Sequence, residues 1–139
     1  MAVDDEIDPG DQILRSIPVH ALMGLSTVQR GPHTIMTMEM TERVRGTGEG
    51  SIHGGLLATL ADVTCSTSLW GSYDYPTVVP VTTDMHVRYF RQPRSGPLRA
   101  EAQLVHQGRR ILSSECVIVD GDNRVLARST ATYMLVTMP

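Results

Sequence analysis

The stretch SIHGGLLATLADVTCSTSLWG, residues 51–71, is the one long segment of the chain with a helical pattern. Its only formally charged side chain is that of Asp62, and most of its other residues are apolar or small. A helix this poor in charge is buried nearly all round in a folded protein. We therefore predict a central buried helix that has Ser51 as its N-cap and ends at Trp70, just before Gly71.

Four segments that follow this stretch are rich in β-branched residues and are separated by short turn-forming sequences. They are Thr77 to Phe90, Leu98 to Gln107, Ile111 to Val119 and Arg124 to Val136. A further candidate strand, TIMTMEM from Thr34, places Met36, Met38 and Met40 on one side, where core packing is favoured over an adaptable pocket. Short connections join antiparallel neighbours. We predict an α+β fold, with one helix against a long antiparallel sheet.

Length and charge limit the possible functions. A chain of 139 residues fits one domain, and we expect an acidic tail and short helix over residues 1–20 and a single domain over residues 21–139. The first eleven residues hold five of the fifteen acidic side chains, so the remainder carries twelve arginines against ten acids. This mildly basic body suits a small anionic ligand and does not predict a nucleic-acid partner.

The N-terminus has no signal-peptide pattern, and no apolar run is long enough to span a bilayer. We therefore expect a cytoplasmic protein without a membrane partner. Cys65 and Cys116 show no metal-ligand spacing, so they are predicted to be small buried hydrophobic residues, and no metal or cofactor is expected.

The glycine-rich loop GTGEGSIHGG, residues 46–55, follows a predicted strand and precedes the predicted helix. This order is typical of nucleotide-binding loops. A Walker loop, however, requires a lysine, and the chain contains none. The dinucleotide pattern requires a third glycine where Ser51 stands. Both nucleotide-binding interpretations are therefore excluded.

Asp62 needs a compensating partner, because an aspartate inside a buried helix is costly when it is unpaired. One interpretation is a structural carboxylate that caps a backbone group or pairs with an arginine. The alternative is functional, because Gly54 and Gly55 present free N–H groups at the positive end of the same helix. A donor that polarises a carbonyl group, together with a carboxylate base or nucleophile, indicates acyl chemistry.

Helix geometry constrains this functional interpretation. Gly54 and Asp62 are eight residues apart, which separates them by about 80° around the helix axis and about 12 Å along it. One carbonyl group cannot easily contact both residues on one helix. Two antiparallel copies of the helix, related by a two-fold axis, bring Gly54 of one chain to Asp62 of the other. The acyl chemistry therefore predicts a dimer.

Several motifs together resemble the hotdog-fold acyl-CoA thioesterases of the PaaI-like group. They are GSIHGGLLATLAD, VTTDMHVRYFRQPRSGPLRAEAQLV, GRR and ARSTATYML, and they span about residues 24–136. The resemblance implies a central helix wrapped by a five- to six-stranded antiparallel sheet. It also implies a homodimer with a continuous sheet, often paired again into a tetramer, and hydrolysis of an acyl-CoA thioester.

The resemblance further implies roles for individual residues. Gly54 would donate its N–H to the thioester oxygen, and Asp62 of the partner chain would be the nucleophile or the base. Thr82 would position water, and His53 would fix the helix start or lie near the thioester sulfur, with a core histidine as the alternative. Relatives usually carry Asn or Gln where this chain has Thr47, whose shorter side chain cannot present the same amide.

Arginines are suited to binding the phosphates of CoA. The candidates are Arg88, Arg91, Arg94 and Arg109, with ordinary solvated surface positions as the alternative. Gly55 and Ser66 are further candidates for substrate contact. Two other functions remain open: a dehydratase that uses His53 with an acid, and a module that binds acyl-CoA without turnover.

Overall fold

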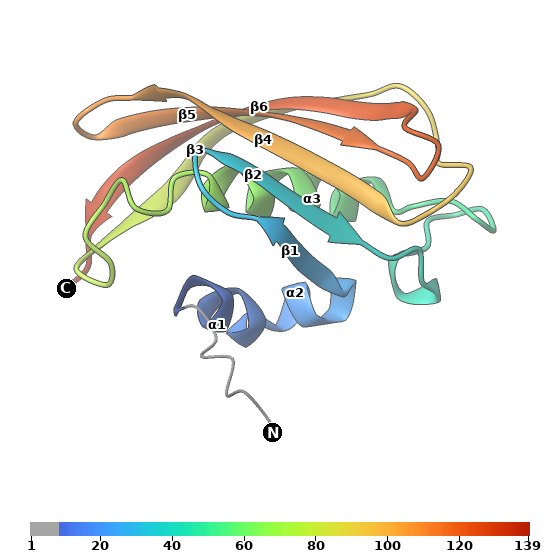
Figure 1. The fold of residues 1–139 in the computed structure, drawn as a ribbon, viewed down its shortest axis with the longest axis horizontal. Helices are drawn as coiled ribbons and strands as arrows, with labels where there is room; N and C mark the ends of the chain where they lie inside the picture. The colour runs from blue at the N-terminus through green and yellow to red at the C-terminus, as the bar shows by residue number, and fades with distance from the viewer. Residues whose placement is uncertain (1–8) are drawn as a thin grey trace.

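The computed structural model describes residues 9–139 and contains one six-stranded antiparallel sheet, with the strand order β1-β2-β4-β5-β6-β3. The longest helix, α3, lies against one face of this sheet (Figure 1). The elements are α1 (Pro9–Ser16), α2 (Pro18–Met23), β1 (Leu25–Gln29), β2 (His33–Met38), the 3-10 helix η1 (Glu42–Val44), α3 (Gly54–Thr67), β3 (Val78–Tyr89), β4 (Leu98–Gln107), β5 (Ile111–Val119) and β6 (Val125–Thr137). The predicted α+β class, with one helix against an antiparallel sheet, is confirmed.

The strands match the expectation from sequence closely, but both ends of the central helix differ from it. The helix begins at Gly54 with His53 as its N-cap, because the Ser51 hydroxyl donates to the Gly48 carbonyl oxygen instead and Ile52 forms an isolated bridge with Arg45. The helix ends at Thr67, and the next residues continue as turns. The predictions of a Ser51 cap and of helix through Trp70 were therefore wrong.

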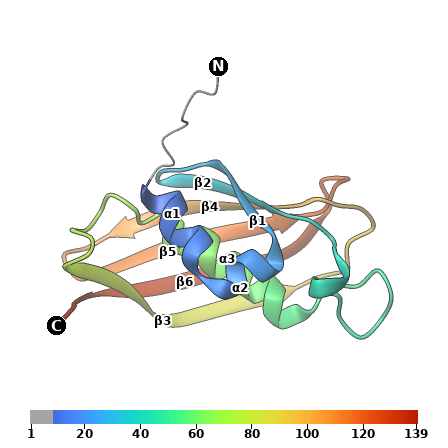
Figure 2. The ribbon, with the colours of Figure 1, turned by 90° about the horizontal axis from the view of Figure 1, so that it is seen from below.

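Two elements near the N-terminus were not predicted from the sequence. Helix α2 begins at Pro18 and closes at Gly24 with a left-handed φ of 66°. Strand β1 then forms the sheet edge beside β2. Helices α1 and α2 lie on the side of α3 that faces away from the sheet (Figures 1 and 2). The predicted acidic tail over residues 1–8 lies outside the described residues.

The core lies between α3 and the inner face of the sheet. Met36 and Met38 on β2 are fully buried there with Leu60 of α3, which confirms core packing for these methionines, and Met40 packs against the same cluster. Within residues 9–139, no helix has both the length and the apolar character that crossing a bilayer requires.

Asp120 joins two loops at one end of the sheet. Its carboxylate accepts hydrogen bonds from the backbone N–H groups of Arg94 at 3.1 Å and of Asp122 and Arg124 at 3.0 Å each. The Arg124 guanidinium lies 3.4 Å from it. Burial alone would raise the pKa of Asp120, but these hydrogen bonds and the arginine outweigh burial and hold it below the ordinary value. These hydrogen bonds connect the loop between β3 and β4 to the β5–β6 turn.

We predict that Asp120→Asn destabilises the protein near neutral pH and that its difference from wild type shrinks in acid. The folded-state pKa is lowered, so the unfolded chain takes up the proton first as pH falls. The stabilisation is therefore complete above the unfolded-state pKa and is lost as pH falls through the folded-state value. Urea midpoints of both proteins between about pH 7 and pH 3 test this. Asp122→Asn, an exposed neighbour in the same turn, is the control, and an equal loss in both variants would contradict the prediction.

Candidate active site

The carboxylate of Asp62 on α3 is held against the sheet by two hydroxyl groups. Tyr133 on β6 donates to Asp62 Oδ1 at 2.8 Å, and Thr82 on β3 donates to the same oxygen at 3.0 Å. Thr82 and Tyr133 are directly paired between the two strands, so both hydroxyls reach the helix from adjacent positions of the sheet. The compensation that Asp62 requires comes from these hydroxyls, and no arginine pairs with it among residues 9–139.

Tyr133 is a permanent donor at this position. Its side chain is 1% exposed, and burial above all raises the pKa of Tyr133, with nearby Cys65 and Asp62 raising it further. Its hydroxyl therefore stays protonated near neutral pH. Because both donors bind Oδ1, the second oxygen of Asp62, Oδ2, has no hydrogen-bond partner in the described part of the chain. The carboxylate is thus oriented by hydrogen bonds to Oδ1, while Oδ2 makes none within residues 9–139.

The helix start is organised by His53. Its Nδ1 accepts a hydrogen bond from the Gly55 N–H at 3.0 Å, and its carbonyl oxygen accepts from Leu56 and Leu57. An acceptor Nδ1 places the proton of the neutral ring on Nε2. The Gly54 N–H is left without a partner among residues 9–139. The sequence predicts both glycines as donors, but in the structure only the Gly54 N–H is free within the described residues, because the Gly55 N–H donates to the His53 cap.

Two residues that were not predicted from the sequence hold the start of the helix in place. The Tyr89 hydroxyl, at the end of β3, donates to the Gly54 carbonyl oxygen at 2.7 Å. The side-chain amide of Gln92 accepts from the Ile52 N–H at 2.9 Å. Tyr89 lies 35 positions from Gly54 and Gln92 lies 40 positions from Ile52, so no local pattern in the sequence links them to the helix start. Each ties the chain after β3 to the helix N-terminus.

A cavity of about 330 Å³ lies beside this helix start. It is lined by Thr47, His53, Gly54 and Gln92, among others. Thr47 has no side-chain amide. Gln92, which has one, lines the same cavity. Thr47 itself is exposed.

The structure does not bring Gly54 and Asp62 together within one chain. Gly54 stands at the first position of α3, about 12 Å along the axis from Asp62. The same separation is present along β3, where Tyr89 contacts Gly54 and Thr82 contacts Asp62. The candidate site therefore has two separate parts within one chain. We call the part around Gly54 and the part around Asp62 the two half-sites.

The remaining candidates are dispersed. Ser66 lies one helical turn after Asp62, and its hydroxyl donates to the Val63 carbonyl oxygen. Arg91 and Arg94 are exposed in the loop that contains Gln92. Arg109 is exposed in the β4–β5 turn, which lies at the opposite end of the sheet from the residue 46–50 loop (Figure 1). Arg88 lies on the outer face of the sheet, away from α3.

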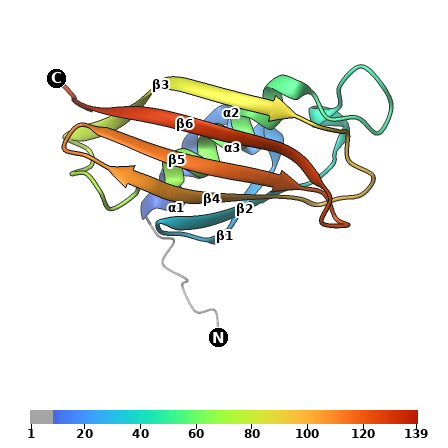
Figure 3. The same cartoon turned by 90° about the horizontal axis from the view of Figure 1, so that it is seen from above.

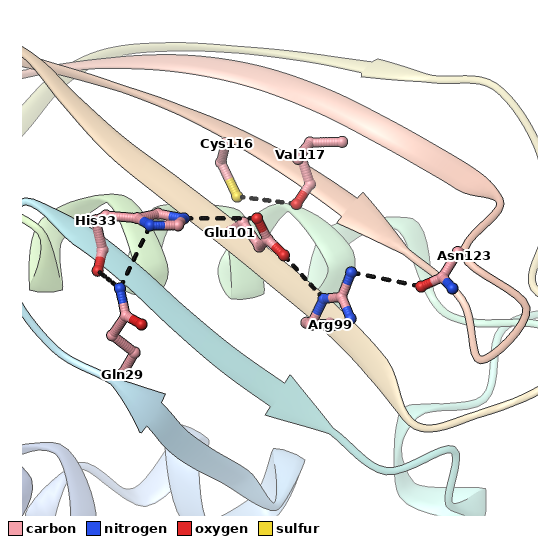
Figure 4. Close-up of polar contacts among 7 residues, drawn as sticks. All are labelled: Gln29, His33, Arg99, Glu101, Cys116, Val117 and Asn123. Carbon is pink, nitrogen blue, oxygen red and sulfur yellow. Dashed lines mark hydrogen bonds and ion pairs between the residues drawn. The ribbon is translucent and has the colours of Figure 1, made fainter.

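That outer face carries the larger hollow, of about 640 Å³. Figure 4 shows part of its polar network, in which Glu101 lies between His33 at 3.5 Å and Arg99 at 3.0 Å. The strands of this face are seen from above in Figure 3. The sheet separates the hollow from Asp62 and Gly54. We therefore place the candidate site on the α3 side of the sheet, where the smaller cavity adjoins the free N–H group of Gly54 and Asp62 lies about 12 Å further along the helix.

His20 on α2 lies within electrostatic range of Asp62. Burial lowers the pKa of His20, while a hydrogen bond to the Leu14 carbonyl and the charge of Asp62 oppose this change. Because a carbonyl oxygen only accepts, His20 Nδ1 is the donor at 3.1 Å. No three His, Cys, Asp or Glu side chains between residues 9 and 139 are grouped to hold a metal ion.

A family model described as "Thioesterase superfamily" matches residues 49–127, more than half of the chain. The chain belongs to the thioesterase superfamily. The matched segment contains the whole of α3 together with β3, β4 and β5. It therefore includes Gly54, Asp62, Thr82 and Tyr89, and the family to which the sequence motifs pointed is confirmed.

Individual known proteins resemble the chain over different lengths. A Halobacterium salinarum protein named as a possible esterase is 36% identical over 75 residues, which are 53% of this chain and 49% of that protein, so the match spans about half of that relative. A thioesterase of Haemophilus influenzae has a TM-score of 0.80 at 23% identity, over 90% of this chain and 87% of its own. The Escherichia coli PaaI protein has a TM-score of 0.79 at 20% identity, over 91% and 90%. The structural likenesses confirm the hotdog fold.

We predict that His53→Ala lowers the free energy of unfolding by about 1 kcal/mol, because the helix loses the side chain that accepts the Gly55 N–H. His53→Asn restores a short acceptor at the N-cap and should recover most of the loss. Denaturant unfolding of the two variants and wild type measures the effect. An equal loss in both variants would show that His53 acts through something other than the cap.

Proposed function

We propose that the protein is an acyl-CoA thioesterase that hydrolyses a CoA thioester to a free acid and CoA. The observation that carries this proposal is the state of Asp62, whose carboxylate is oriented by two hydroxyls through Oδ1 while Oδ2 has no partner in the described chain. A pair of fixed hydroxyl donors is expected for a carboxylate that must keep one orientation during a reaction. Membership of the thioesterase superfamily supports the same reaction class.

The oxyanion donor in this proposal is the Gly54 N–H. It stands at the positive end of α3 and is the first-turn N–H that the His53 cap leaves unoccupied. A carbonyl oxygen that gains negative charge during attack is stabilised by such a donor and by the helix dipole. Gly55 contributes indirectly in this proposal. Its N–H is bonded to His53 Nδ1 and so completes the cap.

The reaction requires two chains, because Gly54 and Asp62 are too far apart on one helix to contact one carbonyl group. In a homodimer, Gly54 of one protomer binds the thioester oxygen while Asp62 of the other acts. Asp62 Oδ2 either attacks the carbonyl carbon, which gives a mixed anhydride that water then hydrolyses to the free acid, or it takes a proton from a water molecule that attacks the carbonyl carbon itself. The carbon–sulfur bond breaks, and the CoA thiolate leaves and is protonated. Thr82 has its hydroxyl on Asp62, so it acts by orienting the carboxylate.

The phosphates of CoA are proposed to bind to exposed arginines near the cavity. Arg91 and Arg94 flank Gln92, which lines the cavity beside Gly54. Arg109 lies at the opposite end of its own sheet, and a two-fold axis across β3 brings the Arg109 turn of the second protomer toward this end. Association of two such dimers stays a prediction, as does a cytoplasmic location.

The hydrogen bonding of His53 disfavours a dehydratase. A histidine base needs a free ring nitrogen with a lone pair, whereas Nδ1 of His53 is occupied by the Gly55 N–H and Nε2 carries the proton of the neutral ring. His53 is therefore proposed as the cap of the helix, with its Nε2–H directed to the exposed side.

We predict that Asp62→Asn reduces kcat for acyl-CoA hydrolysis by at least about 1,000-fold, because the amide fits the same space but is neither a nucleophile nor a base. The measurement is release of free thiol from short, medium, long and aryl acyl-CoA esters. Glu115→Gln, an exposed carboxylate on the outer sheet face, is the matched control and should keep full activity.

Full activity of Asp62→Asn would overturn the mechanism. Saturable binding of acyl-CoA by the wild-type protein without thiol release would instead identify a binding module. Loss of a 3-hydroxyacyl-CoA with its thioester intact would identify a dehydratase.

A further inference from the structure

Gln92 is a polar side chain of the candidate site to which the proposed reaction gives no part. It lies in the loop between β3 and β4, and it lines the cavity beside the helix start together with Gly54. Its side-chain amide is bonded to the backbone of Ile52, two residues before Gly54. The amide is therefore fixed close to the N–H group that is proposed to bind the thioester oxygen.

The hydrogen bonds of Gln92 determine which way its amide faces. The Ile52 N–H donates to Oε1 at 2.9 Å, and an N–H group can bond only to the oxygen end of an amide. Nε2 lies 3.5 Å from the Ile52 carbonyl oxygen, which is long for a hydrogen bond of this kind. Nε2 carries two hydrogens, and the second has no acceptor within residues 9–139. The amide thus presents a free donor from a fixed position.

Four side chains that line the cavity carry a hydrogen-bond donor, namely Thr47, Ser51, His53 and Gln92. The Ser51 hydroxyl already donates to the Gly48 carbonyl oxygen. No hydrogen bond to the described residues holds the Thr47 hydroxyl in one place. His53 has its Nε2–H directed to the exposed side in the proposed function. Gln92 is therefore the donor of the cavity that is both fixed in position and without an acceptor in the described chain.

We propose that Gln92 is a catalytic residue, whose Nε2–H donates to the thioester oxygen together with the N–H of Gly54. Both donors belong to one chain and to the half-site around Gly54. Two donors that are in place before the reaction stabilise the negative charge that develops on this oxygen when the carbonyl carbon is attacked. The inference rests on the proposed thioester hydrolysis, to which it adds a second oxyanion donor from the β3–β4 loop.

Gln92→Glu separates this role from a purely structural one. A carboxylate keeps an oxygen that accepts the Ile52 N–H, so the urea midpoint should stay close to that of wild type, but a carboxylate has no hydrogen to donate. We predict that kcat for thiol release falls at least about 100-fold, the usual effect of removing one oxyanion donor, while KM changes little. Gln103→Glu adds the same charge on the outer face of the sheet and is the matched control, with full activity expected.

Gln92→Met is a neutral variant of similar size. It removes the acceptor for the Ile52 N–H as well as the donor, so the urea midpoint and kcat should both fall. Only the donor is absent from both variants, because Gln92→Glu keeps the acceptor. A loss of kcat that is common to the two variants therefore belongs to the donor.

Binding of two inert acyl-CoA analogues tests the contact without turnover. In a ketone analogue, a methylene group replaces the thioester sulfur and the carbonyl oxygen remains. In a thioether analogue, the sulfur remains and a methylene group replaces the carbonyl. Wild type should bind the ketone more tightly, and Gln92→Glu and Gln92→Met should each reduce this preference about two- to tenfold, which corresponds to one hydrogen bond. The CoA part is common to both analogues, so charge effects on its phosphates cancel in the ratio of Kd values.

The outcomes distinguish the role of Gln92 from the reaction itself. Unchanged kcat and an unchanged ratio of Kd values in Gln92→Glu would overturn the role of Gln92 and leave the thioesterase proposal in place. A fall in kcat with an unchanged ratio would assign the loss to the added charge and would overturn it as well. A fall in kcat in Gln92→Met alone would show that Gln92 acts only through Ile52. Loss of the ketone preference in Gln92→Glu, in a protein whose wild type releases no thiol, would support the donor and overturn the hydrolysis.

Discussion

The orientation of the Asp62 carboxylate is the interaction on which the rest of the site depends. A charged side chain in a helix made mostly of small and apolar residues needs hydrogen bonds, and Tyr133 and Thr82 provide them. Those hydroxyls come from paired positions on the two strands at one side of the sheet. The same contacts fix α3 against β3 and β6, so the packing of the helix and the orientation of the Asp62 carboxylate depend on the same hydrogen bonds.

The helix N-terminus forms the other half of the site, and His53 decides its chemistry. By capping Gly55, it leaves the N–H of Gly54 as the unoccupied donor of the first turn. Tyr89 and Gln92 then hold the residues on either side of His53 from the far end of β3. Strand β3 therefore contacts both parts of the candidate site, at Thr82 and at Tyr89.

Much of the fold was predictable from local patterns. The bounds of β4 and β5 agree with the expected segments, and those of β3 and β6 agree within one residue at each end, because β-branched runs between turn sequences define them. Strand β1 was missed because it is short and partly exposed, without a clear alternation. The N-cap was placed at Ser51 because serine is the commoner cap, whereas the bridge between Arg45 and Ile52 keeps the chain extended as far as His53.

The sequence by itself determined the central helix, its single carboxylate at Asp62 and its glycine start, because these follow from the helical pattern and from the absence of other charged residues in that stretch. Only the tertiary structure decided which hydroxyls hold Asp62, which glycine keeps a free N–H and which face of the sheet carries Arg88. Tyr133 lies 71 positions from Asp62, and the extra residue at Thr83 exchanges the faces of β3. Local periodicity encodes neither distant strand pairing nor such a shift in register.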